Sequence, residues 1–582
     1  MKNRNEALAA EKKHLTLLED AAEYLEHFDI LETITNVGND EVFTPRKTCE
    51  MLLDALPEDI WKHSEYKWLN PATKNGVFER EIALRLDEGL KDEIPDEETR
   101  RKHILQNMIF AIGQTRFTAS VARRTLYYCC EANRKCDGKK INGHYENGYA
   151  IGKGTWFDTE EGNILTPNTD HTYVGKEKEE KCKYCGISKK SQYNSEDQIE
   201  KYAYEFIHFD KDKILEHLQD RFFKGDRNMK FDVIIGNPPY QMGDGGGSNN
   251  SSAMSIYHKF AQQAFELDPK YICMIIEARW MTGGKGEGLE EFRLRMLKDR
   301  HISRLIDFVD SKECFPQNDI KGGVCMFLWD KNHNGECRIT THVAEEVKES
   351  VRFLQSSEDF EIYIRDEILE GITKKIRQVD SRMMEEMVSS RKPYGIESSA
   401  LKENSSKKLP GLSETPTTGG AIYGLGNNNE RVKRYLSADF KLPQQTKCFD
   451  KYKVFIAKAY GCGTIGEVPS TPVLSTPVLS TPGEVCTETF LEIGPFETVA
   501  EAQNVIRYIK TKFFRALVGI QKQTQNTTKQ TYRFVPIQDF TPDSDIDWND
   551  NINGLDSQLF KKYNLNKEEI DFINKNISEM KE

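Results

Sequence analysis

The stretch that most constrains the fold is residues 231–240, which read Phe-Asp-Val-Ile-Ile-Gly-Asn-Pro-Pro-Tyr. Val233, Ile234 and Ile235 form a β-branched run that is typical of a buried strand in a parallel sheet. The two prolines that follow fix φ and remove backbone donors, and a residue before proline is pushed out of the helical region. The sequence therefore predicts an α/β domain in which a rigid corner follows the carboxyl end of a buried strand.

This corner would present three groups to one small volume: the Asn237 side-chain carbonyl, the Pro238 backbone carbonyl and the Tyr240 ring. Ligands of open α/β sheets bind at that edge. Two fixed acceptors beside an aromatic face suit an exocyclic amine on a flat ring, and adenine N6 fits this description. Acceptance of both amine hydrogens would restore lone-pair density on the nitrogen, which is electrostatic preorganisation rather than base catalysis. The alternative is a strand followed by a proline turn without chemistry.

Residues 231–240 resemble the catalytic motif of amino-group DNA methyltransferases, specifically the N6-adenine enzymes of the TaqI-like (gamma) class. The similarity extends to Val42-Phe-Thr-Pro45, Ala278-Arg-Trp280 and Gly322-Gly-Val-Cys-Met-Phe-Leu-Trp329. It implies a Rossmann-like methyltransferase domain with a mostly parallel seven-stranded sheet, followed by an α+β target-recognition domain. It also implies S-adenosylmethionine as methyl donor and double-stranded DNA as partner. The catalytic residues that it implies are Asn237, Pro238, Pro239 and Tyr240.

Two stretches before this motif fit the cofactor site that the resemblance implies. In the first, Phe43 would pack the methionine end of the cofactor, Thr44 would supply a polar contact, and Pro45 would begin a helix. A Thr-Pro pair before a helix is also an ordinary cap. The second, residues 68–78, has the order strand, loop, helix of a nucleotide-type site, although a plain strand-to-helix turn would look similar.

The loop in residues 68–78 departs from the family pattern at two positions. Asn70 replaces the usual acid and Lys74 replaces the first glycine, so that Asn70, Ala72 and Gly76 are the cofactor contacts that the resemblance leaves. The next strand, residues 108–112, should end in an acid that holds the ribose hydroxyls. The sequence has Gln114-Thr115 there, so either residue substitutes for the acid, or the contact is absent.

A third strand is expected over residues 204–210. The Asp210 carboxylate at its end fits the position that contacts the adenine amine of the cofactor, but it could equally cap a helix beginning near Lys211. Further strands that would complete the sheet are expected at residues 271–276, 302–308 and 324–329.

An insertion over residues 127–200 carries several cysteines, among them the knuckle Cys182-Lys-Tyr-Cys185-Gly186. Two thiolate pairs are typical of structural zinc, which stabilises segments too small to form a core. Cys130 competes with its neighbour for one ligand place, and His144 and His171 are possible substitutes; unligated thiols are the alternative. The predicted ligands are Cys129, Cys136, Cys182 and Cys185.

Composition limits the remaining possibilities. The chain has 582 residues, enough for two or three domains, and a net charge of −12, which argues against a general nucleic-acid coat but not against a local basic face. No apolar run of about 18 residues offers a membrane span, and the start of the sequence does not look like a secretory signal. We therefore expect a cytoplasmic protein with no membrane contact, whose thirteen cysteines are thiols or metal ligands.

We expect three segments: a helical segment over residues 1–40, the methyltransferase domain over residues 41–345, and the target-recognition domain over residues 346–582. The first is too short for a nuclease domain of about 100 residues. Residues 470–482 carry a short repeat that we interpret as a tolerant surface loop. Residues 511–515 and 521–530 combine cations, aromatics and amides suited to phosphate and base-edge contacts, with a solvated helix face as the alternative.

The sequence thus predicts a site-specific DNA methyltransferase that modifies N6 of a flipped-out adenine, within a restriction-modification system. Three alternatives stay open. The chain could methylate RNA or a protein glutamine, although neither substrate needs so large a recognition domain. The chain could be the modification and recognition subunit of a restriction enzyme whose nuclease is a separate chain, or a DNA-binding relative whose catalysis is impaired by the changes at Asn70 and Lys74.

Overall fold

A computed structural model describes most of the chain: residues 42–127, 132–133, 156–176, 180–189, 203–242, 254–283, 286–320, 322–343, 346–355, 360–460, 474–522 and 526–580. The segment predicted to be helical, residues 1–40, lies outside this part. The chain divides into two compact units. The first comprises Met1–Ala278, Gly284–Thr340 and Glu349–Leu354, and the second comprises Arg279–Gly283, Thr341–Lys348 and Gln355–Glu582.

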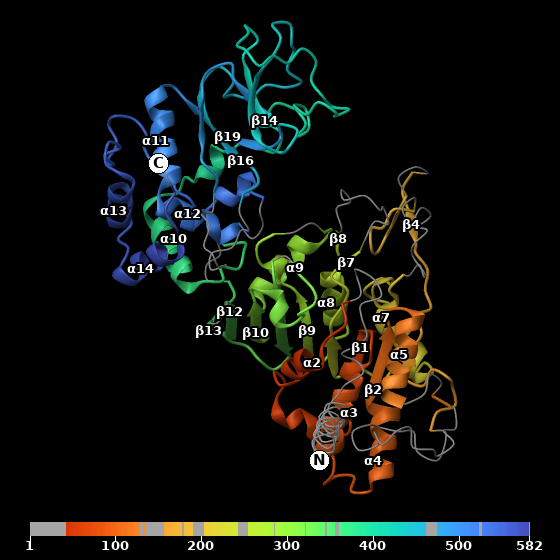
Figure 1. Ribbon diagram of the computed structural model, residues 1–582. Helices are drawn as coiled ribbons and strands as arrows, with labels where there is room; N and C mark the ends of the chain where they lie inside the picture. The colour runs from red at the N-terminus through yellow and green to blue at the C-terminus, as the bar shows by residue number, and fades with distance from the viewer. Residues whose placement is uncertain are drawn as a thin grey trace, which may run out of the picture. The chain divides into compact units, whose positions relative to one another are not determined.

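A nine-stranded sheet forms the centre of the first unit, with the order β13-β12-β10-β11-β9-β6-β1-β2-β3 (Figure 1). The pairs β2–β3, β1–β2, β1–β6 and β6–β9 are parallel, whereas β11 is antiparallel to both β9 and β10. The strands are β1 (Trp68–Thr73), β2 (Ile109–Gly113), β3 (Ile164–Leu165), β6 (Val233–Gly236), β9 (Tyr271–Glu277), β10 (Ile302–Phe308), β11 (Val324–Asp330), β12 (Cys337–Val343) and β13 (Glu346–Arg352). The predicted α/β class with a mostly parallel sheet is confirmed, but the sheet has nine strands rather than seven.

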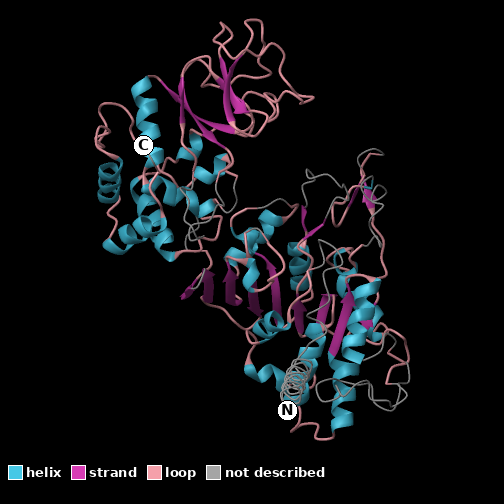
Figure 2. Ribbon diagram, viewed as in Figure 1, coloured by secondary structure: helices cyan, strands magenta, loops and turns pink. Residues whose placement is uncertain are grey.

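The central strands are covered on both faces. Every residue of β1, β2 and β6 is buried, as expected for the continuous apolar runs of parallel strands. Helices provide the cover, as Figure 2 shows for the first unit. They are α2 (Arg46–Leu53), α3 (Val77–Gly89), α4 (Glu97–His103), α5 (Arg116–Tyr127), α7 (Ile214–Phe223), α8 (Tyr257–Glu266) and α9 (Leu289–Lys298).

The prediction of a strand over residues 204–210 is wrong. The segment forms a short 3-10 helix, η5 (Glu205–Ile207), and β3 occupies the sheet edge beside β2 instead. The cause is the buried Glu205 carboxylate, which accepts a hydrogen bond from the Asn168 backbone N–H at 2.7 Å and pairs with Arg221 of α7 at 3.0 Å. These polar contacts hold the segment against α7 instead of in the sheet.

The second unit contains helices and short strands. Its elements are α10 (Glu367–Val379), η8 (Met384–Glu386), β14 (Ala421–Leu425), β15 (Arg431–Tyr435), β16 (Tyr452–Ala457), β17 (Val478–Ser480), β18 (Val485–Cys486), β19 (Phe490–Phe496), α11 (Val499–Lys510), α12 (Lys512–Gln521), η9 (Lys529–Tyr532), α13 (Ile552–Lys562) and α14 (Lys567–Asn576). Part of the short repeat that we expected to be a surface loop is β17, which pairs with β16. Among the described helices of the chain, none combines the length and apolar character needed to cross a bilayer.

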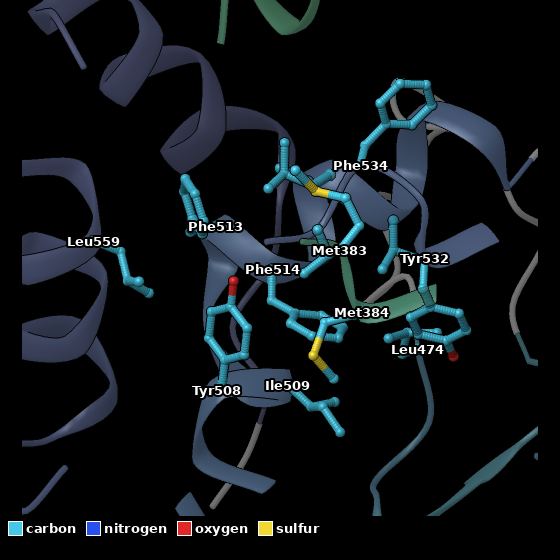
Figure 3. Packing of buried hydrophobic residues seen from close by; sticks show 14 of the residues in the cluster. Met383, Met384, Leu474, Tyr508, Ile509, Phe513, Phe514, Tyr532, Phe534 and Leu559 are labelled. Carbon is cyan, nitrogen blue, oxygen red and sulfur yellow. The ribbon is translucent and has the colours of Figure 1, made fainter. Parts of the chain in front are cut away.

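The hydrophobic core of this unit corrects a second expectation. Phe513 and Phe514, predicted to contact DNA or to lie on a solvated face, are fully buried and contribute to the packing shown in Figure 3. Arg515 is also buried, and its guanidinium donates hydrogen bonds to the backbone carbonyls of Thr511 and Ser578 at 3.1 and 2.6 Å. Phe513, Phe514 and Arg515 therefore stabilise the core and do not face DNA.

Candidate active site

The Asn-Pro-Pro-Tyr corner begins where β6 ends, between the carboxyl ends of its parallel neighbours β1 and β9. Gly236, the last residue of β6, makes this approach possible. A Cβ atom there would lie 2.6 Å from Oδ1 of Asn70, which is too short for any non-bonded contact. The close contact between the ends of β1 and β6 brings the corner and the residues 68–78 loop to one edge of the sheet.

The Asn237 side chain is held in one orientation. Its Nδ2 donates hydrogen bonds to Thr44 Oγ1 at 3.1 Å and to the Val42 carbonyl at 3.4 Å. Because a carbonyl can only accept, the nitrogen must face Val42. Asn237 is 3% exposed, and its Oδ1 is buried without a hydrogen-bond partner in the described part of the chain. An unpaired buried acceptor costs about 1–3 kcal/mol and is rare in folded proteins, so this oxygen calls for a functional explanation.

Lys74, which stands where the family has a glycine, supports the same segment. Its side chain is buried, and Nζ donates a hydrogen bond to the Val42 carbonyl at 2.9 Å. The Val42 carbonyl therefore receives hydrogen bonds from both Lys74 and Asn237. The lysine that departs from the family pattern therefore has a structural role, because Lys74 links the loop after β1 to residues 42–45.

Tyr240 lies among other aromatic rings and is 8% exposed. Its ring meets those of Tyr257 and Phe315 edge to face, with centroids 6.4 Å away in each case. Burial raises the pKa of the Tyr240 hydroxyl well above its ordinary value. Phe315 was not predicted from the sequence. The sequence signal that could have identified it is the pair Phe315-Pro316 after the strand at 302–308. The catalytic corner likewise combines prolines with an aromatic residue.

The loop after β1 uses its polar side chains internally. Asn70 Nδ2 donates to Glu79 Oε1 at 2.8 Å, and Asn70 Oδ1 accepts from the Ala72 N–H at 3.1 Å. Burial raises the pKa of the Glu79 carboxyl, which lies in the first turn of α3. Gly76 adopts φ +78°, and a Cβ there would lie 2.8 Å from the Ala122 Cα of α5. Its small size therefore serves packing against a helix.

Only one of the two residues proposed to replace the ribose-binding acid has a side chain available. The Thr115 hydroxyl is engaged in reciprocal hydrogen bonds with Thr118 at the start of α5, between 2.8 and 3.1 Å. The Gln114 side chain is 2% exposed, and its Oε1 is buried with no hydrogen-bond partner among the described residues. Of the two side chains, that of Gln114 is therefore the one whose acceptor is unused within the described residues.

Asp210 lies apart from these groups, after η5 and not at the end of a strand. Its carboxylate pairs with Lys183 Nζ at 2.5 Å and accepts a hydrogen bond from the Tyr184 hydroxyl at 3.4 Å. The hydrogen bond from Lys183 lowers the pKa of Asp210. No contact described in the structure joins Asp210 to Asn237 or Gln114.

A second group of polar side chains gathers around the cysteine knuckle. Cys182 and Cys185 lie with His171 and His208, and one ligand atom of each falls within 4.8 Å of all the others. Of the predicted zinc ligands, Cys129 and Cys136 lie outside the described residues, as does His144. His171 was foreseen as a substitute. His208 was not, because it lies in the segment that we interpreted as a strand.

Comparisons with known proteins agree with the resemblance. Residues 107–315 match the Eco57I restriction-modification methylase family. A protein of Mycoplasma pneumoniae described as an uncharacterized adenine-specific methylase is 43% identical over 380 residues, which is 63% of this chain and 87% of that protein.

Solved structures of restriction-modification proteins also match. The type IIL enzyme MmeI in complex with DNA has a TM-score of 0.45 and 11% identity, over 91% of this chain and 74% of that one. The nuclease-deletion mutant of the type ISP enzyme LlaGI has a TM-score of 0.43 and 12% identity, over 85% of this chain. The chain spans 45% of the LlaGI structure and 50% of a type I modification subunit from Vibrio vulnificus. The extended match to the Mycoplasma protein shows that this chain belongs to the adenine-specific methylases.

Proposed function

We propose that the chain transfers a methyl group from S-adenosylmethionine to N6 of an adenine flipped out of double-stranded DNA. The observation that carries the proposal is the unpartnered Oδ1 of Asn237, which is held at the carboxyl end of β6 by the hydrogen bond from Asn237 Nδ2 to Thr44. An acceptor that is buried and oriented in advance needs no reorganisation when it binds an amine.

The corner would act on the base through its two oxygens. Asn237 Oδ1 and the Pro238 carbonyl would accept the two amino hydrogens, while Pro239 keeps the backbone rigid. Holding both hydrogens raises the lone-pair density at N6, and stacking on Tyr240 fixes the plane of the base. S-adenosylmethionine, when bound, supplies an electrophilic methyl group on a sulfonium. The chain's contribution is therefore orientation and electrostatics, with no general base required.

A second unpaired oxygen at the same edge fits such a cofactor. Gln114 Oε1 after β2 is a buried acceptor without a partner in the described structure. The cofactor carries an ammonium and two ribose hydroxyls, which are donors. We propose that Gln114 accepts from the ribose.

The remaining predicted contacts divide into two groups. Phe43, Thr44, Pro45 and Ala72 lie beside the corner or in the loop that faces the same edge, and they keep their proposed cofactor role. Asp210 lies apart from them, and its carboxylate is paired with Lys183 through Oδ1.

Entry of the base requires movement. Asn237 and Tyr240 are 3% and 8% exposed, and the rings of Tyr257 and Phe315 pack on Tyr240. We propose that these rings turn outward when the base enters, since the amide of Asn237 must stay bonded to Thr44 to keep its oxygen in place. We also propose that the second unit supplies target recognition, and that a nuclease, where the system has one, is a separate chain.

The test is direct. The purified chain is incubated with S-adenosylmethionine and genomic DNA, the DNA is digested to nucleosides, and the products are identified by mass spectrometry. We expect N6-methyl-2′-deoxyadenosine as the product. Methylated cytosine, or no product, would contradict the proposal.

A catalytically impaired relative is the second candidate, because Asn70 and Lys74 depart from the family pattern. Calorimetry with S-adenosylmethionine separates the two. An impaired relative should bind DNA but show no heat of cofactor binding, whereas the enzyme should bind the cofactor.

A further inference from the structure

Four side chains converge on one point: three come from the insertion, and His208 comes from the segment that follows it. Their ligand atoms are His171 Nδ1, His208 Nε2 and the sulfurs of Cys182 and Cys185. Both thiols and His208 are buried, at 3%, 1% and 4% exposure. The two rings and two sulfurs come from three separate stretches of chain, so their convergence is a property of the fold and not of one motif.

The spacing of these atoms matches tetrahedral zinc. Bond lengths of about 2.3 Å to sulfur and 2.0–2.1 Å to nitrogen place two nitrogen ligands about 3.3 Å apart, and a nitrogen and a sulfur about 3.6 Å apart. His171 Nδ1 lies 3.3 Å from His208 Nε2 and 3.4 Å from Cys185 Sγ. A tetrahedral set of two thiolates and two imidazoles is the preferred environment of this metal.

The surroundings prepare His208 for the role of ligand. Its Nδ1 lies 2.7 Å from the Tyr204 carbonyl, which can only accept, so the proton must be on Nδ1. The lone pair of Nε2 therefore points toward the cluster. A carbonyl behind a ligating imidazole is the usual arrangement at metal sites, because it fixes the tautomer and the ring orientation.

The knuckle has the local geometry that zinc sites require. Gly186 adopts φ +77°, and its N–H donates to the Cys182 carbonyl at 2.9 Å, which closes the turn around both sulfurs. Strands β4 (Tyr173–Val174) and β5 (Lys181–Cys182) form an antiparallel pair in which Tyr173 faces Cys182. This pairing brings His171 alongside the knuckle.

The knuckle also contacts elements that follow the catalytic corner. Strands β7 (Gln241–Met242) and β8 (Met254–Ser255) pair directly after Tyr240 (Figure 1). A Cβ at Gly186 would lie 2.5 Å from the Met254 side chain, and Lys259 Nζ of α8 donates to the Tyr184 carbonyl at 2.5 Å. The turn of the knuckle thus packs against β8 and α8.

We infer that His171, Cys182, Cys185 and His208 bind one structural zinc ion, which fastens the insertion to the strand pair that holds Tyr240. This set replaces the four-cysteine set expected from the sequence. The metal contributes no chemistry to methyl transfer. A two-stranded hairpin has too little core to be stable alone, and metal ligation supplies the missing stabilisation.

The test is metal content of the full chain, purified without chelators and measured by inductively coupled plasma mass spectrometry. We expect about one zinc ion per chain. The double variant Cys182→Ser/Cys185→Ser and the single variant His208→Ala should lower the content well below this. Two controls should leave it unchanged: Cys448→Ser, which alters a buried thiol in the second unit, and Cys129→Ser/Cys136→Ser.

A second measurement on the unmodified sequence covers the case in which the variants do not fold. Growth with cobalt in place of zinc should give the absorption of tetrahedral cobalt with thiolate charge transfer, and added zinc should remove it. Absence of stoichiometric metal from the unmodified chain would overturn the inference. So would loss of zinc from the Cys129→Ser/Cys136→Ser variant with retention in the His208→Ala variant, since the ligands would then be the four cysteines.

Discussion

Replacing Asn237 by alanine should separate activity from stability. The substitution removes one preorganised acceptor, which is worth about 10²–10³-fold in rate. It also removes the donor to Thr44, a loss of about 1 kcal/mol, but it relieves an unpaired buried oxygen that costs about 1–3 kcal/mol. The two effects on folding nearly cancel. We therefore expect turnover to fall at least 100-fold, with a free energy of unfolding within about 1 kcal/mol of the original.

Asn163 offers a matched control. It is also buried, but both Nδ2 hydrogens are used, since the amide donates to the carbonyls of Leu105 and Gln106 at 3.0 and 2.9 Å. Asn163→Ala should lose about 1–3 kcal/mol of stability and keep its rate per folded molecule.

The assay is single-turnover transfer of a tritiated methyl group to DNA at saturating cofactor, with denaturant unfolding measured in parallel. The reasoning is refuted if Asn237→Ala turns over within ten-fold of the original chain, or if it is destabilised as strongly as Asn163→Ala.

Four other substitutions test three separate parts of the account. Gln114→Ala should weaken S-adenosylmethionine binding about ten-fold in calorimetry, the worth of about one hydrogen bond, whereas Thr115→Ala should leave affinity unchanged and cost about 1 kcal/mol of stability at the helix start; the reverse pattern would exchange their roles. Gly236→Ala should cost about 1–3 kcal/mol in denaturant unfolding because its Cβ would meet Asn70, and an unchanged midpoint would contradict the close contact. Burial lowers the pKa of His258 to about 4, so its contribution to stability is complete above its unfolded pKa of about 6.5 and is lost as pH falls toward 4. His258→Gln, which keeps a donor, should flatten the pH dependence of unfolding in this window, and an unaltered slope would contradict the assignment.

The sequence allowed prediction where chemistry is local. The apolar runs at 233–235, 271–276 and 324–329 became buried strands because such runs have few alternatives once helices cover both faces. The position of the Asn-Pro-Pro-Tyr corner after β6 follows from the prolines themselves.

What the sequence did not reveal depends on distant partners. Residues 204–210 were predicted to be a strand. Glu205 is instead buried in an ion pair with Arg221 and lies in a 3-10 helix. His208 could not be recognised as a companion of Cys182 and Cys185 because the fold alone brings it there. Phe513 and Phe514 look suited to DNA contact in sequence, although burial decides their role and is set by α13 and α14.

The departures at Asn70 and Lys74 show the same limit. From the family pattern both looked like losses, but the structure uses Asn70 to orient Glu79 and Lys74 to hold the Val42 carbonyl. Comparing single positions with the family pattern does not show the new partners that Asn70 and Lys74 have elsewhere in the fold.

The central claim is that an oriented amide oxygen on Asn237 prepares adenine N6 for methylation. It is tested most directly by methylation-aware sequencing of DNA from cells that express the chain or its Asn237→Ala variant. The account predicts N6-methyladenine at one recurring sequence context with the original chain and none with the variant. Equal modification by both chains, or modification of another base, would contradict it.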